Sequence, residues 1–181
     1  MIDPDATARR QQRLRRRFQP ARVRLLFLGE APPASGRFFY QRDSGLYRAM
    51  RDAFLSVDPS IDDETFLPAF QASGCHLIDL CRQPVDRLDS HSRRAICRSS
   101  ENSLARAIAR LQPDMIATLL RSVEGNVARS ASRAGWRGRF IYLPYPGRWS
   151  RHKSAFLRAL IPEIQALMHG SGGGLLDSVS V

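Results

Sequence analysis

Short apolar runs alternate with helical patterns between residues 23 and 169, and this alternation restricts the fold more than any other feature of the chain. The first run, Val23 to Leu28, is too short for a helix and ends at Gly29, which is typical of a strand buried on both faces. Further strands are predicted where similar runs recur, at residues 75–80, 114–120 and 139–145.

The segments between these runs have helical spacing. After Ser44, a residue type that favours the N-cap, apolar side chains recur three and four positions apart, at Leu46, Ala49, Met50, Ala53 and Phe54. Further helices are predicted from after Asp62 to Gly74, before Pro113, over Ser122 to Ala134, and after the fourth run, where Pro162 predicts a bend. The alternation predicts an α/β fold of three layers, with helices flanking a central, largely parallel, four-stranded sheet.

Charge divides the chain unevenly. The 181 residues carry a formal net charge of +11, and eight arginines lie between Arg9 and Arg24 against the two acids Asp3 and Asp5. We therefore divide the chain into a basic N-terminal arm (1–22), a single α/β domain (23–169) and a flexible, Gly-rich tail (170–181). Such a positive field attracts polyanions, most often nucleic acid, although an arm that only improves solubility is the alternative.

Several classes of protein are disfavoured by composition. No apolar run approaches the roughly 18 residues of a membrane helix, and the N-terminus is too polar for a secretory signal. Cys75, Cys81 and Cys97 are odd in number and lack paired CxxC spacing, so we expect reduced, structural thiols rather than disulfides or a metal site. The expectation is a soluble, cytoplasmic protein, monomeric by default, without metal or cofactor and without a membrane partner.

Ligands of parallel sheets bind beyond the carboxyl ends of the strands, which directs attention to the loop "GEAPPASGRFFY" at 29–40. In this loop Gly29 allows close backbone approach, and the two prolines that follow stiffen the turn. Glu30 supplies a carboxylate that either acts chemically, caps a helix or pairs with an arginine. Phe39 is the aromatic residue we expect first to stack on a base, with core packing as the alternative.

Four segments resemble motifs of the uracil-DNA glycosylase superfamily. They are "GEAPP" at 29–33, "GRFFY" at 36–40, "RDSGLYRAM" at 42–50 and "LPYPGRWS" at 143–150. The family writes its first motif GEAPG or GQDPY and its second, after the last strand, typically His-Pro-Ser. The resemblance covers roughly Val23 to Leu167. It implies an enzyme that flips a damaged base out of DNA and hydrolyses its N-glycosidic bond, without a metal or nucleotide cofactor.

The resemblance also implies roles for individual residues. Gly29, Ala31 and Pro32 would contact the base, and Ala31 stands where the GQDPY branch has its catalytic aspartate. Glu30 or Asp43 would therefore handle the attacking water, with a slight preference for Glu30. The alternative for Asp43 is a favourable charge at a helix N-terminus.

Two further positions depart from the family pattern. Asp79 stands where many members have a base-reading asparagine: it would accept from the base N3–H, be kept protonated by burial, read a base with an amino group, or be structural. Tyr145 stands near the missing histidine and would donate to the leaving base, or merely pack. DNA contacts are expected from Arg37, Arg148, Trp149, Arg151 and Lys153; a solvated helix start would explain the charges after residue 147 about as well, but not the tryptophan.

Two rival functions remain at this point. The missing histidine and Ala31 are compatible with a non-catalytic nucleic-acid-binding module of the same fold. An enzyme of free nucleosides is less favoured, because the chain has no GxGxxG and no GxxxxGK[ST] phosphate loop.

Overall fold

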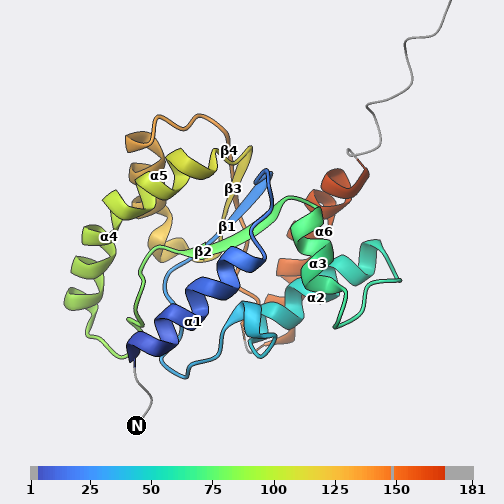
Figure 1. Ribbon diagram of the computed structural model, residues 1–181, viewed down its shortest axis with the longest axis horizontal. Coiled ribbons are helices and arrows are strands. Elements are labelled where there is room, and N and C mark those ends of the chain that lie inside the picture. The colour runs from blue at the N-terminus through green and yellow to red at the C-terminus, as the bar shows by residue number, and fades with distance from the viewer. Residues whose placement is uncertain (1–3, 148, 170–181) are drawn as a thin grey trace, which may run out of the picture.

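The computed structural model describes residues 4–147 and 149–169, and its centre is one parallel sheet. The strands are β1 (Leu25–Gly29), β2 (Cys75–Asp79), β3 (Met115–Thr118) and β4 (Arg139–Tyr142), in the spatial order β2-β1-β3-β4. All three neighbouring pairs are parallel (Figure 1). The predicted strands are thus confirmed, each within a few residues of its predicted ends.

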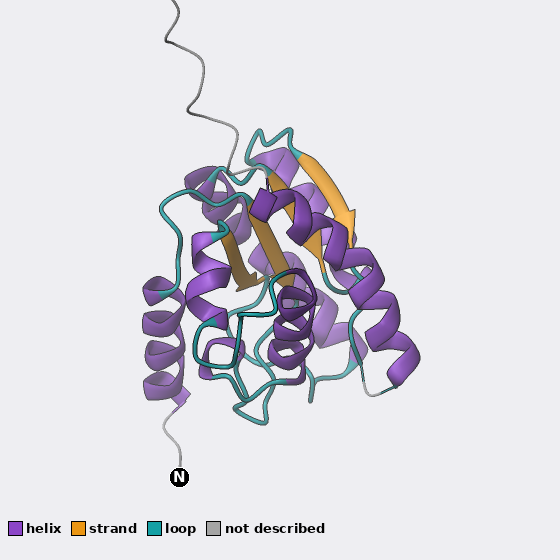
Figure 2. Ribbon diagram, turned by 90° about the vertical axis from the view of Figure 1, so that its right-hand side faces the viewer, coloured by secondary structure: helices purple, strands orange, loops and turns teal. Residues whose placement is uncertain are grey.

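Helices cover both faces of the sheet. They are α1 (Pro4–Arg17), α2 (Gly45–Val57), α3 (Phe66–Ala72), α4 (Ser90–Leu111), α5 (Glu124–Arg133) and α6 (Ser150–His169), with 3-10 turns η1 (Phe39–Gln41) and η2 (Arg121–Val123). Helices α2, α3 and α6 lie on one side of the sheet, and α4 and α5 on the other (Figure 1). A view turned by 90° shows helices both in front of and behind the strands (Figure 2). The predicted three-layer α/β fold is confirmed.

The position of β1 between two hydrophobic cores explains why its sequence is apolar at consecutive positions. Leu25 and Phe27 belong to the core shared with α2, α3 and α6, whereas Leu26 and Leu28 belong to the core beneath α4 and α5. Since successive side chains of a strand point to opposite faces, Gly29 belongs to the first face and the next residue, Glu30, to the second. This alternation decides which candidate residues can meet.

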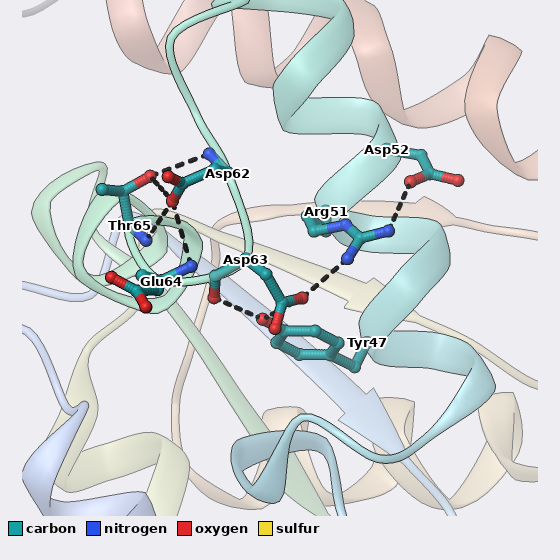
Figure 3. A network of polar contacts seen from close by, with 7 residues as sticks. All are labelled: Tyr47, Arg51, Asp52, Asp62, Asp63, Glu64 and Thr65. Carbon is teal, nitrogen blue, oxygen red and sulfur yellow. Dashed lines mark hydrogen bonds and ion pairs between the residues drawn. The ribbon is translucent and has the colours of Figure 1, made fainter.

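Local signals begin and end the helices as expected. The Ser44 hydroxyl accepts a hydrogen bond from the Tyr47 N–H at 3.1 Å, which makes it the N-cap of α2. The Asp62 carboxylate accepts from the Glu64 and Thr65 N–H groups at 3.0 and 2.8 Å, in the turn before α3 (Figure 3). Helix α6 continues through Pro162 to His169.

The basic arm is part of the packed structure from residue 4 onward. Its helix α1 lies beside β2 (Figure 1), and Phe18, 9% exposed, stacks on Tyr40 with ring centroids 5.8 Å apart. The Gln71 side chain donates to the backbone oxygens of Arg17 and Gln19. A merely solubilising arm therefore does not describe residues 4–18, while the predicted tail at 170–181 lies outside the described residues.

Candidate functional site

The carboxyl ends of β1 and β2 bring Gly29 and Asp79 side by side. They are register partners in the parallel ladder, and a Cβ added to Gly29 would lie 2.5 Å from Asp79 Oδ1. The glycine is thus required because it makes room for a neighbouring carboxylate. The sequence-based reason for Gly29, close approach of the backbone to a ligand, is a different one.

Asp79 is a buried carboxylate with a cationic partner. Its side chain is 9% exposed, and the Arg15 guanidinium of α1 forms an ion pair with Oδ2. Burial raises the pKa of Asp79, and the charge and hydrogen bond of Arg15 act in the opposite direction. Sequence analysis missed Arg15, because nothing distinguished it from the other arginines of the basic arm.

Asp43 belongs to the same region through a chain of contacts. The Phe38 N–H donates to Asp43 Oδ1 at 2.7 Å, and the Phe38 ring lies under the Arg15 guanidinium, 4.9 Å from its carbon to the ring centroid. Asp43 is exposed, and its other oxygen has no hydrogen-bond partner in the part of the chain that the structure describes. This carboxylate is free to accept a hydrogen bond from water.

Tyr145 supplies a phenol within electrostatic reach of Asp79. Its side chain is 44% exposed, and partial burial, reinforced by the negative charge of Asp79, raises the pKa of the phenol. The hydroxyl therefore stays protonated at neutral pH and remains a hydrogen-bond donor. We call Arg15, Phe38, Asp43, Asp79 and Tyr145 the Asp79 cluster.

Glu30 lies on the opposite face of the sheet from this cluster. It is 8% exposed, and the Arg93 guanidinium of α4 binds both carboxylate oxygens, with Nε 2.7 Å from Oε1. The Cys97 Sγ is 3.7 Å from the same oxygen. The structure thus separates Glu30 from Asp79 and Tyr145, contrary to the sequence-based preference for Glu30, and realises the alternative in which it pairs with an arginine.

Phe39 lies in the core, so the expectation that it stacks on a base needs correction. Its side chain is 3% exposed and is surrounded by the rings of Tyr40, Tyr47, Phe66 and Phe70, with centroids 5.0 to 6.2 Å away. Aromatic edges and faces enclose the ring, and no surface of it is left for a base. Core packing, the alternative considered for Phe39, is what the structure has.

The rest of the first motif forms a turn that is held in place by hydrogen bonds to the loop after β2. Pro32 is buried, and Ala31 packs against the core beneath α4 and α5. The Ala34 N–H donates to the Asp86 carboxylate at 3.2 Å, which fastens this loop to the one after β2. Neither Ala31 nor Pro32 belongs to the Asp79 cluster.

The expected DNA-contacting residues differ in accessibility. Arg37 and Arg151 are exposed, and Trp149, immediately before α6, is 63% exposed. Lys153 is exposed as well, and it pairs with Asp52 on α2 at 2.5 Å. Asp52 also faces Arg51 (Figure 3). Arg148 lies outside the described residues.

The cysteines are buried free thiols. Cys81 Sγ and Cys97 Sγ lie 3.7 Å apart, and burial raises the pKa of Cys97 to about 12. Burial raises the pKa of Cys75 and Cys81 as well, which makes all three poor nucleophiles at neutral pH.

Within residues 4–147 and 149–169, no group of three or more His, Cys, Asp or Glu side chains is placed to hold a metal ion. No helix of the same ranges is long and apolar enough to cross a membrane.

Comparison with models of known protein families and with curated protein sequences finds no match to this chain. The resemblance to uracil-DNA glycosylases therefore depends on the motifs in the sequence.

Proposed function

We propose that this chain is a monofunctional DNA glycosylase that hydrolyses the N-glycosidic bond of a flipped-out uracil or related deaminated base. The observation that carries the proposal is the Asp79 cluster, in which Arg15 and Phe38 link Asp79 to Asp43 at the carboxyl end of a parallel sheet and the charge of Asp79 acts on the Tyr145 phenol. The net charge of +11 supports a polyanionic partner. On this proposal the enzyme acts on DNA in the cytoplasm, as a monomer and without a cofactor.

Each acid of the cluster has a separate task in this mechanism. Breaking the bond between the base nitrogen and C1′ leaves positive charge on the sugar and an electron pair on the departing base. Asp43 accepts a proton from the water that attacks C1′, because its second oxygen is available. Asp79 accepts from the base N3–H, and Tyr145 donates to a base oxygen where negative charge develops.

Arg15 determines whether a base can reach the site. Its guanidinium neutralises Asp79 and covers the Phe38 ring, so one displacement would uncover both an acceptor and an aromatic face. A DNA phosphate is the natural competitor for an arginine in this position. Phe38 is as buried as Phe39, at 3% exposed, but the Arg15 guanidinium forms part of its cover, so Phe38 replaces Phe39 as the ring proposed to stack on the base.

A non-catalytic nucleic-acid-binding module is the second candidate. It is favoured by the ion pair between Asp79 and Arg15 and by the enclosure of Phe39 in the core. On this reading the exposed Trp149 and Arg151 contact DNA and no bond is cleaved.

Single-turnover cleavage of labelled oligonucleotides separates the two functions. Single- and double-stranded DNA carrying uracil, hypoxanthine, xanthine or only normal bases is incubated with excess protein and then treated with alkali. The glycosylase proposal predicts a strand break at the damaged base and none in the normal strand. Retarded mobility in a gel, without a break in any oligonucleotide, would instead support the non-catalytic nucleic-acid-binding module.

A further inference from the structure

A second candidate site lies on the other face of the sheet. A cavity of about 560 Å³ opens between the N-terminal half of α4 and the start of α5, and Glu30 lines it from the end of β1. Four arginines line the same cavity, namely Arg93, Arg94, Arg98 and Arg129. None of these residues belongs to the Asp79 cluster.

Two of the four arginines are paired with acids. Arg93 is bound by Glu30, and Arg129 donates two hydrogen bonds to Glu101, at 2.9 and 2.7 Å. Glu101 is 1% exposed and also pairs with Arg133 at 2.9 Å, so one buried carboxylate anchors Arg129 at the cavity wall and shares its charge with a second arginine. These pairs shape the cavity without cancelling its charge.

The other two arginines leave the cavity positive. For Arg94 and Arg98 the described ranges contain no ion-pair or hydrogen-bond partner. They are four residues apart on α4, and both line the cavity, so they lie on the same side of the helix. Ser90 and Ser122 add hydroxyl donors from the two helical walls. The cavity is therefore lined by hydrogen-bond donors and carries two positive charges without an acidic partner among the described residues.

We propose that this cavity binds a phosphate group. Guanidinium groups bind phosphate oxygens through paired, charge-assisted hydrogen bonds, and a tetrahedral dianion matches two cations with flanking hydroxyl donors. The phosphate belongs either to a small phosphorylated compound or to the DNA backbone. Because the cavity and the Asp79 cluster lie on opposite faces of the sheet, phosphate binding does not depend on glycosylase activity.

The test compares two double variants. Arg94→Gln/Arg98→Gln removes the unpaired cations, and Arg13→Gln/Arg17→Gln removes an equally spaced, exposed pair of arginines on α1 that lies outside the cavity. Inorganic phosphate should raise the Tm of the unmodified protein and of the second variant above that in chloride of equal ionic strength. The first variant should lose this rise, and calorimetry should show phosphate binding weakened at least tenfold.

Competition then identifies the source of the phosphate. If the cavity takes a backbone phosphate, an undamaged oligonucleotide raises the apparent Kd for inorganic phosphate; if it takes a small compound, the Kd is unchanged. Either result is compatible with a phosphate site at Arg94 and Arg98. The proposal is overturned if phosphate stabilises no more than chloride, or if both double variants lose the effect equally.

Discussion

Asp79 organises its surroundings more than any other single residue. Its carboxylate occupies the space beside Gly29, pairs with Arg15 and, through Arg15, is linked to Phe38. Two of these contacts join residues that are 50 or more positions apart in the chain. The arrangement of Gly29, Arg15 and Phe38 around the site therefore depends on one buried acid, Asp79.

Gly29→Ala should destabilise the protein by about 1–3 kcal/mol, as overpacking does, because the new Cβ would collide with Asp79 Oδ1. Urea unfolding followed by circular dichroism measures the loss. Gly45→Ala is the matched control, since its Cβ would meet only the Arg48 side chain at 4.0 Å. In an Asp79→Ala background the cost of Gly29→Ala should shrink. An equal cost in both backgrounds would mean that the collision is not its cause.

Arg15→Met should reduce the free energy of unfolding at pH 7 by about 3–5 kcal/mol, because it leaves the Asp79 carboxylate buried without a partner. Arg16→Met, at the exposed neighbouring position, serves as the control and should change stability by less than about 0.5 kcal/mol. Adding Asp79→Asn to Arg15→Met should restore part of the loss. Equal stabilities of the two arginine variants would contradict a stabilising role for this pair.

At the scale of elements, secondary structure was predictable from the sequence wherever a local pattern of residues determines it. The β1 run and the Ser44 cap each contain their own signal, and both were predicted correctly. The partner of the Glu30 side chain was not predictable, because Arg93 lies 63 residues away in the sequence. Phe39 was equally ambiguous, since an aromatic residue beside a loop suits a core and a ligand site alike.

Strand β2 carries a histidine that should make stability depend on pH. His76 is 2% exposed, its Nδ1 lies 3.1 Å from the Tyr40 hydroxyl, and burial, with the charges of Arg15 and Arg110, lowers its pKa to about 4. The folded state thus favours the neutral imidazole. Its contribution to stability is complete above about pH 6.5 and is lost as the pH falls through about 4.

His76→Gln should therefore flatten the loss of stability between pH 6.5 and pH 4, by an amount on the order of 3 kcal/mol. The raised pKa of Asp79 acts in the opposite direction, since protonation of that acid favours the folded state. For this reason the comparison is made between variants at each pH. His91→Gln, at an exposed position, is the control and should keep the pH dependence of the unmodified protein. Equal curves for both variants would show that His76 does not titrate on unfolding.

At the scale of the whole molecule, the sheet separates two kinds of chemistry. Asp79 lies beside Gly29 on the face of α2, α3 and α6, whereas unpaired arginines line a cavity between α4 and α5 on the other face. The three-layer fold was predictable because it needs only the alternation of strands and helices. The division of candidate residues between its faces was not, since it depends on strand register and on partners distant in sequence.

The most direct test of the glycosylase account compares Asp43→Asn with Glu30→Gln in single-turnover cleavage of uracil-containing DNA. An amide at position 43 can still accept from the Phe38 N–H but cannot take a proton from water, so cleavage should fall by about 100-fold or more. Gel retardation checks that DNA binding is retained. Glu30→Gln, on the other face of the sheet, should cleave within a few-fold of the unmodified protein at a temperature where it stays folded. Cleavage lost in folded Glu30→Gln and retained in Asp43→Asn would contradict the account.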